Sequence, residues 1–184
     1  LCFCLLLVLF VSGFGSFNAA QLVFPDFVAG TGVFAFGHMR QVHVLAVIFG
    51  WISMAFAMAM MYITPILGNT RLWSEKLGMW NCMMWNICLA LGLTLMWMGV
   101  TSGREYSDFP WQLDLAVAAF ISIPLAVNVW MTIIKRRTQG IYTTNWIFAA
   151  ATFLLLIVFL VGTLPEYFPL MGLTAATRTL WFGP

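Results

Sequence analysis

Long apolar stretches recur along the chain, and short polar stretches separate them. The stretches are about 20 residues or longer and do not alternate, which is typical of helices that cross a bilayer. Only helices and closed barrels satisfy their backbone hydrogen bonds within lipid, so we interpret these stretches as spanning helices. The chain begins inside the first stretch, so we expect that span to be incomplete. The five predicted spans cover residues 1–24, 41–67, 77–100, 113–134 and 143–164.

The composition supports this interpretation. Hydrophobic residues make up 62% of the 184 residues and charged residues only 8%, and the mean hydropathy is +0.96. A soluble domain carries about 25% charged residues, so this chain cannot cover its surface against water. We predict an all-α, polytopic transmembrane bundle in the lipid bilayer, forming a single membrane domain over residues 1–184. The net charge of +2 is too small to indicate a nucleic-acid partner.

The charged residues predict the orientation in the membrane. Lys and Arg are concentrated in two connections, near 68–76 and 135–140, whereas most acidic residues fall on the other side. By the positive-inside rule these connections are cytoplasmic. The stretches GHMRQVH (37–43) and GREYSD (103–108) and the tail 165–184 then share the outer face. That face is periplasmic if the membrane is a bacterial inner membrane.

Both histidines of the chain lie in GHMRQVH. His43 falls in the first turns of the second span, where an ionisable residue indicates a functional site by default. A neutral histidine bonded to a carbonyl at the membrane interface explains the position equally well. His38 lies further out, and we interpret it as an ordinary loop or interface residue.

The spacing of the two histidines excludes one simple site. Five residues along a helix rotate a side chain by about 140° and raise it by about 7.5 Å. His38 and His43 therefore cannot bind one haem iron from opposite faces of the macrocycle. A methionine could be the second ligand, but no methionine here has a distinguishing context. If His43 binds a haem, we expect the other axial ligand to come from a segment outside this sequence.

Two other places offer charged groups. Arg40 precedes His43 by one helical turn, and it could pair with carboxylates such as haem propionates or simply anchor the helix end at the interface. In TSGREYSDFPWQLD (101–114), Glu105 and Asp108 carry oxygen ligands of the kind that calcium prefers. From the residues alone, a solvated polar turn is the simpler interpretation of this loop.

Several segments together resemble subunit I of the haem-copper oxidase superfamily. The branch that they resemble most is that of the cbb-type cytochrome c oxidases, followed by the nitric oxide reductases. The resemblance extends over most of the chain, and its segments occur in the family's order. They are AAQLVFPDF (19–27), GHMRQVHVLAVIF (37–49), GREYSDFPWQLDL (103–115) and KRRTQGIYTTNW (135–146).

The resemblance implies roles for three residues. His43 matches the axial ligand of the low-spin haem b, and Arg40 matches an arginine near the haem propionates. Glu105 matches a glutamate that binds a calcium ion bridging propionates of the two haems. The high-spin haem and the copper of such an enzyme are bound by later helices, which this sequence does not contain.

Three positions depart from the family pattern. The family usually follows the ligand histidine with threonine and asparagine, whereas Val44 and Leu45 follow here. TRTLWFGP (177–184) resembles the approach to the helix that carries the first copper histidine, but Pro184 is the last residue. Two histidines cannot supply every ligand of such an enzyme, so we expect that this polypeptide alone is not a complete oxidase.

These observations favour one function and leave two alternatives. The favoured hypothesis is the N-terminal half of a split or longer oxidase subunit, completed by a chain with the remaining helices and by c-type cytochrome subunits. Such a complex would reduce oxygen to water with electrons from a c-type cytochrome. The first alternative is nitric oxide reduction by the same architecture, which we favour less because the third span runs straight into GREY. The second is a degenerate, non-catalytic membrane subunit.

Overall fold

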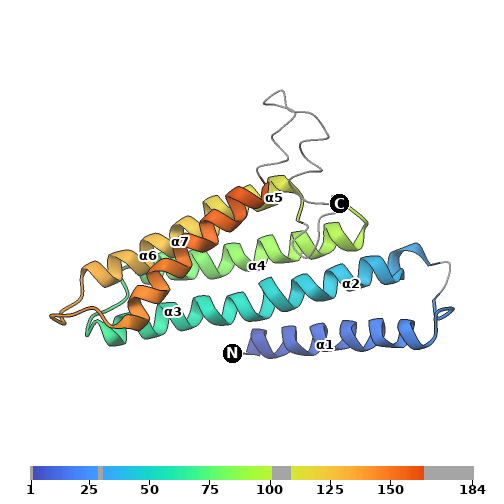
Figure 1. The fold of residues 1–184 in the computed structure, drawn as a ribbon, viewed down its shortest axis with the longest axis horizontal. Coiled ribbons are helices and arrows are strands. Elements are labelled where there is room, and N and C mark those ends of the chain that lie inside the picture. The colour runs from blue at the N-terminus through green and yellow to red at the C-terminus, as the bar shows by residue number, and fades with distance from the viewer. Residues whose placement is uncertain (1, 29–30, 101–108, 164–184) are drawn as a thin grey trace, which may run out of the picture. The chain divides into compact units, whose positions relative to one another are not determined.

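The computed structural model describes residues 2–28, 31–100 and 109–163, apart from the side chains at 2–11 and 162–163. Every element in this part of the chain is helical, which confirms the predicted all-α fold (Figure 1). The α-helices are α1 (Cys2–Val23), α2 (Phe36–Leu45), α3 (Ser53–Leu67), α4 (Glu75–Trp97), α5 (Trp111–Val117), α6 (Ile123–Ile134) and α7 (Thr143–Thr163). Three shorter elements are the 3-10 helix η1 (Gly32–Phe34) and the π-helices η2 (Ala46–Ile52) and η3 (Ala118–Ser122).

Four helices of the described chain are long and apolar enough to cross a membrane. They correspond to the second to fifth predicted spans. The first predicted span coincides with α1, which has 22 residues. Because the side chains at 2–11 lie outside the description, the crossing of α1 stays a prediction. The four helices are Phe36–Leu67, Glu75–Trp97, Trp111–Ile134 and Thr143–Val161.

The second span begins earlier than the apolar pattern predicts, at Phe36 instead of residue 41. All of GHMRQVH is therefore helical. The reason is an amphipathic first segment, in which α2 buries Met39, Val42 and Leu45 at intervals of three residues. That spacing places the three side chains on one face of a helix. Because polar residues lie between these three positions, the sequence shows no continuous apolar run here.

Two spans contain a π-helical turn. In the second span, η2 follows directly after α2, and the hydroxyl of Ser53 donates a hydrogen bond to the carbonyl of Ile48 at 2.7 Å. In the fourth span, η3 ends two residues before Pro124. Proline has no N–H to continue the helical ladder, and a π-helical turn is one way to accommodate such a break.

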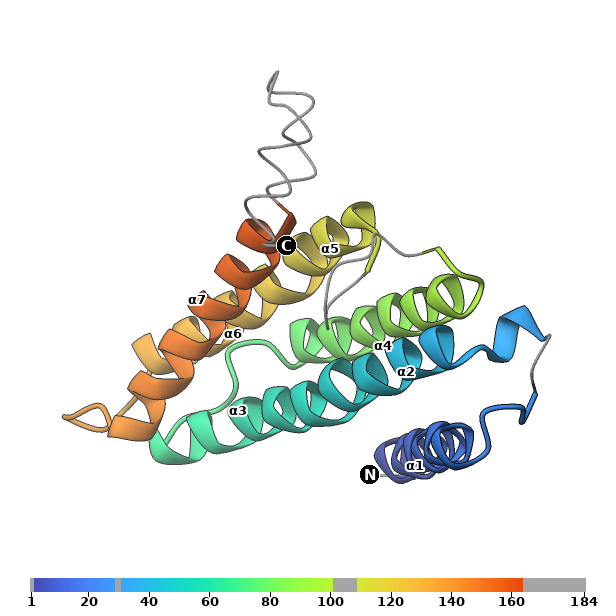
Figure 2. The same ribbon diagram turned by 45° about the vertical axis from the view of Figure 1, so that its right-hand side comes forward.

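The chain divides into two compact units. Unit 1 comprises residues 1–56 and 86–110, and unit 2 comprises residues 57–85 and 111–184. In unit 1, α1 packs against α2 and against η2. In unit 2, α6 and α7 lie side by side, as Figures 1 and 2 both show.

An aromatic cluster in unit 1 packs the connection between α1 and α2 against α1 and the end of α4. Neighbouring rings have centroids 5.5 to 6.0 Å apart, which is the range of favourable edge and tilted contacts. Phe17 contacts Phe27 and Phe34, and Trp97 contacts Phe14 and Phe34. The end of α4 is thereby held beside the start of α2.

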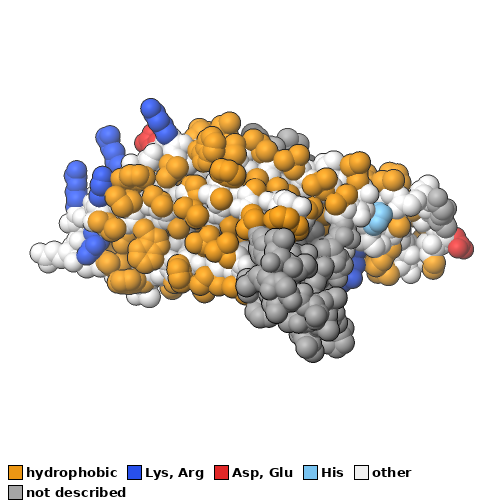
Figure 3. All heavy atoms as spheres, turned by 90° about the horizontal axis from the view of Figure 1, so that it is seen from above, with side chains coloured by type: hydrophobic (Ala, Val, Ile, Leu, Met, Phe, Trp, Pro, Cys, Tyr) orange, Lys and Arg blue, Asp and Glu red, His pale blue; other side chains and the backbone are white. Residues whose placement is uncertain are grey.

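Unit 2 carries basic side chains at one end, where Figure 3 shows a group of Lys and Arg. The amide of Arg137 donates to the carbonyl of Gly68 at 2.8 Å, and the Lys135 ammonium lies 5.9 Å from the centre of the Trp73 ring. The two basic connections therefore lie side by side, as the predicted topology requires. The side of the membrane that they face stays a prediction.

Candidate functional site

The ring of His43 lies against the backbone of Gly15 on α1. A Cβ atom at position 15 would lie 2.8 Å from Cε1, 3.3 Å from Nε2 and 3.4 Å from Nδ1 of His43. Non-bonded carbon atoms prefer separations of about 3.5–4.0 Å. Any residue other than glycine would therefore press against the tip of the imidazole. Gly15 leaves the space that lets this tip lie between α1 and α2.

The backbone that carries His43 is fixed by packing on both sides. Val42 and Leu45 are 1% exposed and Ala46 is 0% exposed, whereas His43 itself is half-buried. Close-packed interiors resist displacement of such residues. His43 is thus held on a rigid helix and stays partly exposed.

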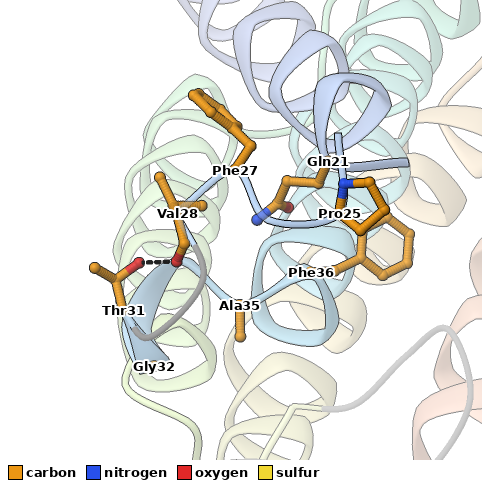
Figure 4. A pocket seen from close by; sticks show the side chains of 8 residues that line it. All are labelled: Gln21, Pro25, Phe27, Val28, Thr31, Gly32, Ala35 and Phe36. Carbon is orange, nitrogen blue, oxygen red and sulfur yellow. Dashed lines mark hydrogen bonds between the residues drawn. The ribbon is translucent and has the colours of Figure 1, made fainter. Parts of the chain in front are cut away.

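Helices α1 and α2 run in opposite directions in the view of Figure 1. Gly15 is level with His43, and six residues further along α1, Gln21 lines the same cavity as Phe36 (Figure 4).

The cavity of Figure 4 has a volume of about 430 Å³ and offers little polar chemistry. The amide Nε2 of Gln21 donates to the carbonyl of Phe34 at 2.7 Å, and the hydroxyl of Thr31 donates to the carbonyl of Val28 at 2.6 Å. None of its lining residues carries a charge. They are Gln21, Pro25, Phe27, Val28, Thr31, Gly32, Ala35 and Phe36.

Asn18 is a buried polar residue on the same side of α1 as Gly15. It is 7% exposed, and both polar atoms of its amide lack a hydrogen-bond partner in the described part of the chain. Residues three apart share a helix face, so the amide lies one turn from the His43 contact. A buried unpaired amide costs about 1–3 kcal/mol. We therefore expect its partner to lie outside the residues described.

Arg40 is exposed and lies one helical turn from His43 on α2. The i, i+3 relationship puts both residues on one side of the helix. The structure thus keeps the predicted Arg40–His43 pair on a single helical segment, with Arg40 nearer to its beginning.

His38 packs at the end of α4. Its ring lies 3.1 Å (Cε1) and 3.3 Å (Nε2) from the place that a Cβ of Gly99 would occupy. Gly99 has a φ of +84° and closes α4 in a Schellman arrangement, in which Val100 donates to Leu95 and Gly99 donates to Met96. The structure gives His38 a packing contact, and its role as a bystander stays a prediction.

Phe109 directly follows the segment with the predicted calcium ligand, and it is packed within unit 1. This side chain is 2% exposed, its ring fills the space that a Cβ of Gly92 would occupy, and its centroid is 5.5 Å from that of Phe49. Gly99 and Phe109, which lie before and after residues 101–108 in the sequence, both pack within unit 1. Glu105 itself lies outside the described residues. Among the residues that are described, no three His, Cys, Asp or Glu side chains gather as a metal site would require.

Comparison with known proteins decides the family. The chain matches the family "Cytochrome C and Quinol oxidase polypeptide I" over residues 1–183. It is 29% identical to a Cbb3-type cytochrome c oxidase subunit CcoN1 of Stutzerimonas stutzeri over 93% of this chain and 37% of that protein. It is 28% identical to a cytochrome c oxidase subunit 1 homolog of Agrobacterium tumefaciens (strain T37), over 90% of this chain and 32% of that protein.

The chain belongs to subunit I of the haem-copper oxidases. It spans about a third of the length of these two relatives. The family resemblance predicted from the sequence is confirmed, and so is the multi-pass membrane character. Haem cofactors are implied by membership of this family.

The residues around His43 fit a bound haem of this family in three respects. An imidazole is a common axial ligand of haem iron. The missing Cβ of Gly15 lets the tip of the imidazole lie against α1, and the Asn18 amide offers unused hydrogen-bonding groups one turn away. The guanidinium of Arg40 is of the kind that binds carboxylates such as propionates. Nothing in this set conflicts with a haem oxidase subunit.

Two of these residues were missed in the interpretation of the sequence. Gly15 has no side chain that indicates a function, and His43, which it contacts, is 28 positions away in the sequence. Asn18 did leave a signal, because Asn18 and Gln21 are amides three residues apart in an otherwise apolar span. Polar residues at such depth mark functional or helix-contacting faces in membrane proteins.

Proposed function

We propose that this chain supplies His43 as one axial ligand of a low-spin haem b in a cbb-type cytochrome c oxidase. The proposal rests on the close contact between the His43 imidazole and Gly15, on a helix that is fixed by buried neighbours. What the haem supplies when bound is one-electron transfer from a c-type cytochrome towards the centre that reduces oxygen to water. The contribution of His43 is to hold that haem at a fixed place and angle.

The second axial ligand comes from another segment. His38 and His43 are on one helix, α2, and the ring of His38 is packed on Gly99 instead of facing His43. The chain has no other histidine. Because it spans about a third of its relatives' length, the missing helices are expected to carry the partner ligand, the ligand of the high-spin haem and the copper ligands. They belong to a longer or split subunit, and c-type cytochrome subunits complete the complex.

The charged residues have supporting roles. Arg40, one turn outward of His43, would neutralise a haem propionate, and its exposed position allows its long side chain to reach outward. Glu105 would offer its carboxylate as a ligand to a calcium ion. The resemblance of GREYSDFPWQLDL (103–115) to a loop of the family supports this assignment.

The proposed orientation follows from the order of residues along one helix. His43 lies near the beginning of Phe36–Leu67, and the basic connection follows its end. With the basic connection in the cytoplasm, the haem side faces the periplasm of a bacterial inner membrane. Protons for oxygen reduction are taken up from the cytoplasm, mostly through other helices.

The test is to purify the complex that contains this chain and to record its reduced-minus-oxidised spectrum. We expect a low-spin haem b signal in the wild type, its loss in His43→Ala, and its retention in the matched variant His38→Ala. An unchanged signal in His43→Ala contradicts the proposal. Intact-mass analysis of the co-purifying chains identifies the segment with the remaining histidines, and turnover with oxygen and with nitric oxide identifies the substrate.

A further inference from the structure

We infer that Gly15 is a positioning residue for His43, and that the absent Cβ of Gly15 sets the angle of the imidazole plane. This inference rests on the proposed function, because it concerns how His43 holds a haem. It starts from the contact at position 15, where an added Cβ would lie 2.8 Å from Cε1 and 3.3 Å from Nε2 of His43.

Such a contact has to be relieved, and the surroundings decide which group moves. The backbone of α2 cannot move away easily, because Val42, Leu45 and Ala46 on both sides of His43 are at most 1% exposed. His43, by contrast, is half-buried, and a side-chain torsion yields more readily than a packed helix backbone. We therefore expect a methyl group at position 15 to turn the ring while α2 stays in place.

Turning an axial imidazole changes the electronic structure of a low-spin ferric haem. The ligand plane determines which iron d orbitals interact with the imidazole π system, so the electron paramagnetic resonance g values follow the angle of the ring. The orientation of the ligand also influences the reduction potential, as other features of the haem environment do. A glycine that acts only in helix packing leaves the angle of the ring, and therefore the g values, unchanged.

Position 13 provides a matched control on the same helix. Gly13 is two residues from Gly15, and a Cβ there would meet no atom within 4 Å. Both glycines lie within α1, so Gly13→Ala and Gly15→Ala make the same change to helix propensity and to hydrophobicity. They differ in whether the new methyl group meets His43.

The experiment compares wild type, Gly13→Ala, Gly15→Ala and Gly15→Val in the purified complex. We expect haem b to be retained in both alanine variants. In Gly15→Ala the largest g value and the midpoint potential of haem b shift by more than the difference between wild type and Gly13→Ala. Gly15→Val, with its larger side chain, shifts them further or loses the low-spin signal.

Three results overturn the inference. The first is a Gly15→Ala spectrum that matches Gly13→Ala. The second is failure of Gly15→Ala to assemble while Gly13→Ala assembles, which assigns Gly15 to helix packing alone. The third is an unchanged haem signal in His43→Ala, which removes the proposed function and this inference together. In the first two results His43→Ala still loses the haem signal, so the proposed function survives on its own.

Discussion

The side chain of Asn128 on α6 binds both backbone groups of Ser74, which immediately precedes α4. Its Nδ2 donates to the Ser74 carbonyl at 3.0 Å, and its Oδ1 accepts from the Ser74 N–H at 3.0 Å. One turn further on, the hydroxyl of Thr132 accepts a hydrogen bond from the N–H of Trp73 at 3.0 Å. Together these bonds attach the basic connection between α3 and α4 to the end of α6 within unit 2.

The first prediction concerns this attachment. Asn128→Leu keeps the number and branching of the side-chain heavy atoms but leaves two backbone groups of Ser74 without their partner. Because Ser74 is only half-buried, water replaces part of the loss, and we expect a cost of about 1 kcal/mol per bond. The connection should then open more often, and trypsin should cleave after Arg71 and Lys76 faster in detergent-purified protein.

The control for this experiment is Gln112→Leu, an amide-to-leucine change at an exposed position of α5. Its cleavage rate should equal that of the wild type. Equal rates in Asn128→Leu and wild type would show that the attachment does not depend on Asn128.

The second prediction concerns the close approach of Phe109 to Gly92. A methyl group at position 92 overlaps the Phe109 ring, so Gly92→Ala should lower the stability of the purified complex by about 1–3 kcal/mol, as overpacked sites do. Phe109→Leu removes the obstacle. The double variant should therefore lose less stability than the sum of the two single variants, which a thermal-unfolding cycle measures.

Gly37→Ala is the matched control, because a Cβ at this helical position meets no atom within 4 Å. We expect it to be neutral or to stabilise by about 0.4–1 kcal/mol. Strict additivity of Gly92→Ala and Phe109→Leu would argue against the contact.

Much of the fold was predictable because lipid imposes simple rules on sequence. The spans follow from apolar length alone, and the structure changes their limits mainly at Phe36, where an amphipathic turn precedes the apolar run. The π-helical turns were not predictable, because no residue type specifies them. Pro124 marked the place of one, and nothing marked the segment 46–52.

The candidate site was predictable only in part. His43 and Arg40 stand out because ionisable groups are rare in spans. Gly15 could not be found this way, since its role depends on the register between α1 and α2. This register results from packing along the whole helix pair and is not encoded by any short motif. Glu105 rests on the resemblance alone, because it lies outside the described residues.

The third prediction compares two left-handed helix caps. Gly99 closes α4 at φ +84°, and Asn69 closes α3 at φ +47° with an equivalent pair of hydrogen bonds. In this conformation a residue with a Cβ is destabilised by about 1–2 kcal/mol, and asparagine is destabilised less than most. Gly99→Ala should therefore lower thermal stability, and more than Asn69→Ala does, because its Cβ also meets the His38 ring at 3.1 Å.

Asn69→Gly should have the opposite effect, because its thermal stability should equal or exceed that of the wild type. A second comparison isolates the ring contact. In a His38→Ala background, the penalty of Gly99→Ala should fall to the backbone cost alone. A penalty that is the same with and without His38 would show that the ring does not press on this position.

The last prediction concerns the unpaired amide of Asn18. In lipid or in a protein interior, an amide without a partner destabilises, and leucine at the same place removes that cost. An amide that pairs with a group outside the described residues behaves in the opposite way, because leucine then breaks the bond and leaves the other group unpaired. We expect the second case, so Asn18→Leu should lower the thermal stability of the assembled complex by about 1–3 kcal/mol. Ser16→Leu, on the exposed side of the same helix, should leave it unchanged. A complex that becomes more stable with leucine would mean that the Asn18 amide has no partner in the assembly and takes no part in binding the haem.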